Sequence, residues 1–143
     1  MSPHSVFLSI TASPGVRGIT ITRGDRILVV HLYAKSVYMA VVSRGCERVL
    51  ADEELKRAAW LLTRLMDRVG RLVKSRYYTY TGPLEVREGE VVFRPYVAPT
   101  SAVEVVLRGG KAAVFAGEWR RRFRTGVDVA AALRRGLELL EKC

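Results

Sequence analysis

The first third of the chain alternates short apolar runs with turn-forming residues. Runs between residues 5 and 45 are rich in β-branched and aromatic side chains, which is typical of strands: SVFLSITA, GVRGITITR, RILVVHLYA and VYMAVVSR. They are separated by Ser13-Pro14-Gly15, Gly24-Asp25 and Lys35-Ser36, residues that favour tight turns. We therefore predict strands joined by short turns, with a two-residue hairpin turn at Gly24-Asp25.

Residues 52 to about 75 change to a helical period. Apolar residues recur there at short, helix-like steps: Leu55, Ala58, Ala59, Leu62, Leu65, Met66, Val69, Leu72 and Val73. We predict a long amphipathic helix that buries this stripe against a sheet, with Asp52 as its N-cap. The opposite face is typical of a solvated surface and carries Arg57, Arg64, Arg68 and Arg71. Trp60 lies among these charges, so we expect its ring to be exposed, covered by a later segment, or used at an interface.

Two hairpins and a second helix are predicted in the rest of the chain. LEVREGEVVFRPYV turns at Glu88-Gly89, and AVEVVLRGGKAAVFAG turns at Gly109-Gly110. A helix follows over roughly residues 126–142, where Thr125 and Asp128 have the spacing of a capping box. Its apolar positions include a seam that suits packing on the sheet or on a partner subunit: Leu133, Leu137 and Leu140.

Together these elements predict one α+β domain over residues 1–143. An antiparallel sheet built from hairpins carries the long helix and the C-terminal helix on one face. The second face of the sheet is then free for a ligand or a partner subunit. Trp60, the leucine seam and the sheet edges offer apolar or unpaired surface, so we expect a homodimer or larger homo-oligomer.

The charge balance indicates an anionic partner. The 143 residues include 24 Lys and Arg, 19 of them Arg, against 14 Asp and Glu, which gives a formal net charge of +10. Such a balance suits nucleic acid first and an anionic membrane surface second. The chain contains no Asn and no Gln, which are thermolabile residues, and this points to a hyperthermophile. For Cys46 and Cys143 we expect two free thiols, with an intracellular disulfide as the alternative.

Motifs of catalysis and of membrane targeting are missing from the sequence. There is no Gly-rich nucleotide loop, no Cys/His cluster, and the only histidines are His4 and His31. The acids lie mostly at helix starts and turns, so we predict no catalytic residue, no metal and no cofactor. The N-terminus lacks the features of a signal peptide, and no apolar run approaches the roughly 18 residues of a membrane span. We expect a cytoplasmic protein with no membrane partner.

Aromatic side chains adjoin Arg in three stretches after the long helix. These stretches and the helix supply the candidate nucleic-acid-binding residues: Arg76, Tyr77, Tyr78 and Tyr80; Phe93, Arg94 and Tyr96; Trp119, Arg120, Arg121, Arg122, Phe123 and Arg124; and Trp60 and Arg64. Single-stranded nucleic acid needs this pairing, because unpaired bases stack on rings and phosphates need cations. If the third stretch is extended, one face carries Arg120, Arg122 and Arg124, and the other carries Trp119, Arg121 and Phe123.

The chain resembles the ThermoDBP-type single-stranded DNA-binding proteins of hyperthermophilic archaea and their related proteins. The resemblance lies in its size, its Arg-rich composition, the helix DEELKRAAWLLTRLMDRVGRLVKSR, and the segments RYYTY and WRRRFR. It implies an α+β domain that is not an OB fold and that holds single strands in an apolar cleft or intersubunit tunnel with basic walls. It also implies self-association.

The sequence therefore predicts a sequence-tolerant single-stranded DNA-binding protein that is not an enzyme. The same physics fits an RNA-binding protein, since a contact to the 2′-hydroxyl leaves no mark on composition. An Arg- and Trp-rich subunit of a larger complex is the alternative from a different class, because these residues also anchor protein interfaces. A nuclease ranks last.

Overall fold

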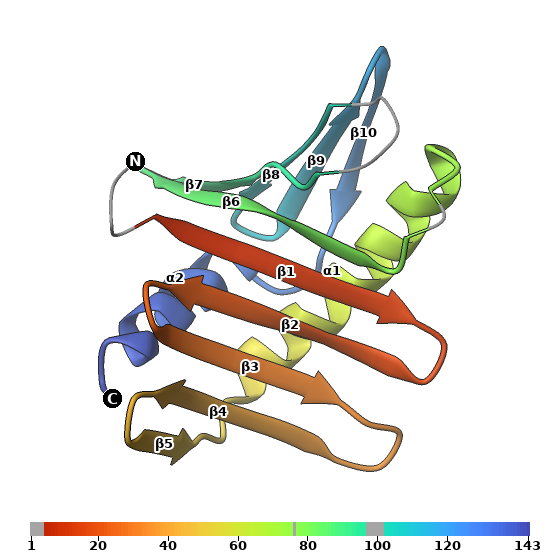
Figure 1. The fold of residues 1–143 in the computed structure, drawn as a ribbon. Coiled ribbons are helices and arrows are strands. Elements are labelled where there is room, and N and C mark those ends of the chain that lie inside the picture. Colours follow the sequence, from red (N-terminus) through yellow and green to blue (C-terminus); the bar gives the residue numbers. More distant parts are fainter. Residues whose placement is uncertain (1–4, 76, 97–101) are drawn as a thin grey trace.

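Ten antiparallel strands form the scaffold of the described protein (Figure 1). The computed structural model describes residues 5–75, 77–96 and 102–143. Within them the strands are β1 (Val6–Ser13), β2 (Val16–Arg23), β3 (Arg26–Leu32), β4 (Val37–Ser43), β5 (Cys46–Val49), β6 (Thr79–Arg87), β7 (Glu90–Phe93), β8 (Val103–Arg108), β9 (Lys111–Ala116) and β10 (Trp119–Arg124). They lie in the order β10-β9-β8-β7-β6-β1-β2-β3-β4-β5. The predicted α+β class and the antiparallel sheet are confirmed.

The described chain runs twice through the same succession of elements. Five strands are followed by helix α1 (Glu53–Leu72), and five more by helix α2 (Val129–Leu140). Each set of strands runs from the centre of the sheet to one edge, and β1 pairs with β6 where the two sets meet. We call β1–β5 the N-terminal wing and β7–β10 the C-terminal wing.

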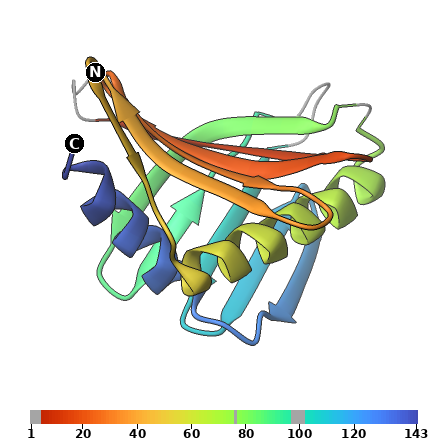
Figure 2. The ribbon, with the colours of Figure 1, turned by 90° about the horizontal axis from the view of Figure 1, so that it is seen from below.

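The sheet curls around both helices, which lie on its concave side (Figure 2). Strand β6 passes between the wings, since its residues up to Pro83 pair with β1 and those from Leu84 pair with β7. Gly82 permits the close approach at this point, because a Cβ atom there would lie 2.0 Å from the carbonyl oxygen of Arg94. Helix α1 packs across β1, β2 and β3, and α2 packs against α1, β2, β3 and β8. Both wings and both helices contribute side chains to one core.

Both described helices begin at an aspartate. The carboxylates of Asp52 and Asp128 each accept a hydrogen bond from the backbone amide three residues further on, at 3.1 and 2.9 Å. The N-cap at Asp52 was predicted, but the capping box that begins at Thr125 is wrong. Asp128 is itself the N-cap of α2, and the Thr125 hydroxyl donates to the carbonyl of Val127 instead. Neither of these two helices has the length and apolar character needed to cross a membrane.

Two of the predicted base-stacking rings lie in the core. Phe93 is fully buried and Tyr80 is 3% exposed. Tyr80 lies against α1 because Gly70 leaves room for it; a Cβ atom at Gly70 would stand 2.2 Å from the Tyr80 hydroxyl oxygen. These positions correct the prediction, because a base cannot reach either ring while the protein is folded.

The leucine seam of the second helix is also part of the core. Leu133, Leu137 and Leu140 are all buried within the domain. The seam therefore packs on the domain itself and presents no apolar surface to a partner subunit.

The two cysteines form a disulfide. Cys46 opens β5 and Cys143 follows α2, and their Cα atoms are 5.9 Å apart although 97 positions separate them in sequence. The expectation of free thiols is wrong, because α2 runs back to the edge of the N-terminal wing and brings the two residues together. The bridge ties the end of α2 to the edge strand of that wing.

Candidate nucleic-acid interface

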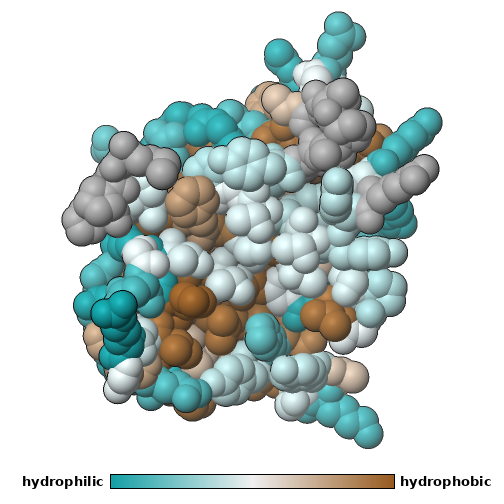
Figure 3. Space-filling view, in the orientation of Figure 1, coloured by the Kyte–Doolittle hydropathy of each residue, from teal (hydrophilic) through white to brown (hydrophobic). Residues whose placement is uncertain are grey.

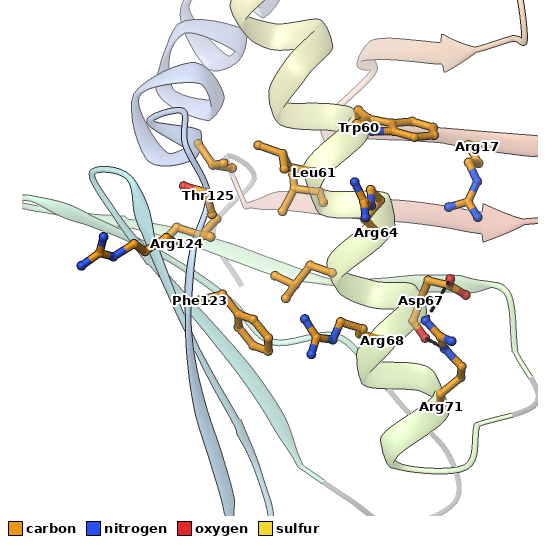
Figure 4. Close-up of a pocket in the computed structure, with 14 residues that line it drawn as sticks. Arg17, Trp60, Leu61, Arg64, Asp67, Arg68, Arg71, Phe123, Arg124 and Thr125 are labelled. Atoms are coloured by element: carbon orange, nitrogen blue, oxygen red, sulfur yellow. Dashed lines mark hydrogen bonds and ion pairs between the residues drawn. The ribbon is translucent and has the colours of Figure 1, made fainter.

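The polar face of α1 borders a groove on the concave side of the sheet, with a volume of about 450 Å³ (Figure 4). Its walls come from α1, from β10 and from the end of β2 that approaches the helix. We call this feature the basic groove and define it by six of its lining residues: Arg17 of β2; Trp60, Arg64, Arg68 and Arg71 of α1; and Phe123 of β10.

The period of α1 places its polar side chains along the groove. Trp60, Arg64, Arg68 and Arg71 follow one another at steps of three or four residues, so they lie on one face of the helix. At the usual rise of 1.5 Å per residue, this row extends over about 16 Å. The opposite face is held in the core by residues such as Leu62 and Met66, so the row cannot rotate away from the groove.

Guanidinium groups lie over the two aromatic rings of the basic groove. The Cζ atom of Arg17 is 5.6 Å from the ring centroid of Trp60, and that of Arg68 is 5.0 Å from the ring centroid of Phe123. Figure 4 shows Arg68 pointing from α1 toward the Phe123 ring of β10. Arginine stacks on aromatic rings and on bases alike, so a planar ligand finds cationic and aromatic surfaces side by side here.

Most of these guanidinium groups have no acidic partner in the part of the chain that the structure describes. Arg17, Arg64 and Arg68 form no ion pair there, while Arg71 pairs weakly with Asp67 at 3.6 Å. The Nη1 atom of Arg17 is buried and has no hydrogen-bond acceptor among the described residues. A buried donor without a partner costs free energy, so Arg17 would gain by turning this group toward an anionic oxygen at this end of the groove.

Strand β10 presents alternate residues to the two faces of the C-terminal wing. Trp119 and Phe123 pair with the buried residues Ala116 and Ala112 of β9, so they face the core side and pack partly against it. Arg120, Arg122 and Arg124 lie on the outer face, whereas Arg121 shares the inner face with the two rings. The stretch is extended, and its alternation follows the prediction.

A second basic surface covers the outer face of β8–β10. Arg108, Lys111, Arg122 and Arg124 surround a shallow depression of about 570 Å³ whose lining also includes Val106 and Ala113. We call these four cations the outer basic patch. Arg120 lies beside it, with its Cζ atom 5.7 Å from the ring centroid of Phe115. Arg124 borders both surfaces, but its side chain points away from α1 (Figure 4).

Arg94 belongs to an ion-pair network on the same outer face. Its guanidinium contacts Glu85 and Glu104, each at 2.9 Å, and Glu85 also pairs with Arg87 at 3.0 Å. Hydrogen bonds from Arg87 and from Arg94 lower the pKa of the Glu85 carboxyl to about 2. The charge of Arg94 is therefore compensated by neighbouring carboxylates, and Arg94 does not line the basic groove.

The remaining predicted residues lie away from the basic groove or outside the described chain. Tyr77, Tyr78 and Tyr96 are exposed, but they do not line the groove. Arg76 lies outside the described residues. The structure thus brings Trp60, Arg64 and Phe123 together and separates them from the other predicted rings.

Three groove residues were missed by the predicted site. The sequence does indicate Arg68 and Arg71, because the helical period places them on the same face as Arg64. That face is, however, also typical of a solvated surface. No feature of the sequence indicates Arg17 as a site residue, because only the packing of β2 beside α1 brings its guanidinium to Trp60.

Neither a metal-binding group among the described residues nor a similar known protein indicates the function of this site. Among residues 5–75, 77–96 and 102–143, no group of three or more His, Cys, Asp or Glu side chains is arranged to hold a metal ion. No family model, no curated protein and no solved structure matches this chain.

Proposed function

We propose that the protein binds single-stranded nucleic acid in the basic groove without sequence preference, with DNA as the natural ligand. One observation carries this proposal: the guanidinium groups of Arg17 and Arg68, which have no ion-pair partner among the described residues, lie over the rings of Trp60 and Phe123 in the same groove. A single strand offers both phosphates and unpaired bases, so it uses both kinds of surface at once.

Stacking in the groove tolerates any sequence, because every base has a π face. A base enters beside Trp60 or Phe123 either by displacing the guanidinium or by stacking on its free face. The displaced or stacked Arg then remains close to the adjacent phosphate. A duplex keeps its bases stacked inside, so it gains only from the charges.

We further propose a single-domain, cytoplasmic protein of a hyperthermophilic archaeon with no catalytic activity. As the family resemblance implies, its fold is not an OB fold, and it works as a homodimer or larger assembly. With the leucine seam buried, the outer face of the N-terminal wing supports self-association best. Figure 3 shows apolar side chains gathered over β3 and β4 on this face. Ile27 and Val42 are exposed there, and the positions next to them in the same row of the sheet are Thr22 of β2 and Phe7 of β1.

RNA remains the nearest alternative ligand, because the groove offers no described feature that separates the two backbones. A protein-interaction subunit is the alternative from another class. It is supported by Trp60, which is 45% exposed beside several Arg side chains, a combination common in protein interfaces.

Fluorescence-anisotropy titrations test the proposal, with single-stranded DNA, duplex DNA and RNA of equal length at several salt concentrations. We expect single strands to bind more tightly than duplex, and Arg64→Ala to weaken single-strand binding. The matched control is Arg44→Ala, which removes one exposed charge in the turn between β4 and β5. Equal binding of duplex and single strands, or equal losses in both variants, would contradict the groove as the site.

A further inference from the structure

A second pocket adjoins the basic groove on the N-terminal side of α1. It has a volume of about 370 Å³, and Trp60 and Leu61 line both the pocket and the groove. We call it the side pocket. The shared residues make the two hollows neighbours, with Trp60 as the wall between them.

Apolar side chains and two rings form the walls of the side pocket. Leu32, Val37 and Val127 come from the end of β3, the start of β4 and the segment before α2, and each is partly buried against the core. Tyr33 and Trp60 complete the lining, with exposed fractions of 56% and 45%. Half-exposed rings beside an apolar lining favour a flat, apolar ligand.

Two cations from α1 also line the side pocket. Lys56 and Arg57 both face Glu53, at 3.8 and 3.7 Å, and all three side chains are well exposed to solvent. Exposed pairs at such distances are weak, so both cations remain able to contact a phosphate. Arg57 lies two helical turns before Arg64, about 10 Å along the helix, so the row of cations in the groove continues to the pocket.

We infer that the side pocket receives one unpaired base of the same single strand whose phosphates lie in the basic groove. This inference rests on the proposed function. The pocket supplies what a base needs, an apolar space beside aromatic rings, and Lys56 and Arg57 supply what the attached phosphate needs. An apolar peptide side chain would fill the same space but would leave the adjoining row of cations without a counter-charge.

The test combines a protein variant with abasic positions in the DNA. Tyr33→Ala removes an exposed ring from the turn between β3 and β4 without touching the core. The control is Tyr96→Ala, which removes an exposed ring elsewhere. We expect Tyr33→Ala to weaken single-stranded DNA binding by about 5- to 150-fold, with an unchanged salt slope. Tyr96→Ala should bind like the parent.

A series of oligonucleotides, each with one abasic position, identifies the ligand of the pocket. In the parent protein, at least one abasic position should weaken binding, and in Tyr33→Ala the penalty at that position should shrink or vanish. Val127→Phe, which fills the pocket from another side, should reproduce the loss.

Three outcomes separate the pocket from the groove. If Arg64→Ala weakens binding while Tyr33→Ala and every abasic position are neutral, the pocket inference is wrong and the proposed function stands. If Tyr33→Ala weakens binding but its penalties at every abasic position equal those of the parent, the pocket does not hold a base and the inference is also wrong. If the parent binds no single strand at any salt concentration, the proposed function itself fails.

Discussion

The basic groove and the outer basic patch carry similar charge but differ in what surrounds it. In the groove, Arg17 and Arg68 lie over aromatic rings within a concave surface between α1 and β10. On the patch, the cations surround Val106 and Ala113 on the outer face of a sheet, and Arg108 already faces Glu90 at 3.7 Å. Charge alone attracts any polyanion, whereas the groove also offers stacking surface to unpaired bases.

The largest expected effect compares a ring of the basic groove with a ring that lies outside both regions. Trp60→Ala should cost about 1–3 kcal/mol of single-strand affinity, because Trp60 offers a stacking surface in the groove. The plot of log affinity against log salt should shift downward in parallel, since no charge is lost. Trp119→Ala is the control: its ring lies on β10, does not line the groove, and packs partly against the core. A larger loss of affinity in a folded Trp119→Ala protein than in Trp60→Ala would reverse this assignment.

The next effect compares one Arg from each region. Arg68→Ala and Arg122→Ala remove the same charge, and the loss of one phosphate contact lowers the magnitude of the single-strand salt slope by roughly 0.7. Arg68→Ala should weaken binding further, by about 0.5–1 kcal/mol, because a base can no longer stack on the free face of the guanidinium that lies over Phe123. The measurement is a salt titration of each variant. Identical curves for the two variants would show that the groove adds nothing beyond charge.

A smaller effect is expected on the ratio of single-strand to duplex affinity when cations of the outer basic patch are removed. The double variant Arg108→Ala with Arg122→Ala should weaken duplex binding more than single-strand binding, because a duplex depends on charge alone. Competition titrations with duplex DNA measure the ratio of the two affinities. A double variant that binds duplex as tightly as the parent would exclude the patch as the duplex contact.

The smallest effect tests the ion-pair network on the outer face. Since the pKa of Glu85 is lowered to about 2 in the folded protein, the ionised carboxylate stabilises the fold above its ordinary pKa, near 4.3. This contribution is lost as the pH falls from that value toward 2. Glu85→Gln should therefore give a shallower fall of the melting temperature over this interval, measured by circular dichroism. Parallel melting curves for variant and parent at every pH would show that the network is too exposed to matter.

The elements that depend on local periodicity can be predicted from the sequence. The steps of three and four residues predicted α1, with Asp52 as its N-cap, and turn residues such as Gly24-Asp25 and Glu88-Gly89 predicted the hairpins. Alternation also separated Arg122 from Phe123 correctly, because side chains in a strand point to opposite faces whatever the sheet packs against.

Which of these faces meet depends on the fold as a whole. Arg17 reaches Trp60 because α1 crosses β2, and Cys46 meets Cys143 because α2 returns to the edge of the N-terminal wing. Phe93 is buried for the same kind of reason. A strand pattern shows that two residues face opposite sides, but only the position of the helices decides which side becomes the core. Contacts between distant segments depend on the packing of whole elements, and local periodicity carries no information about that packing.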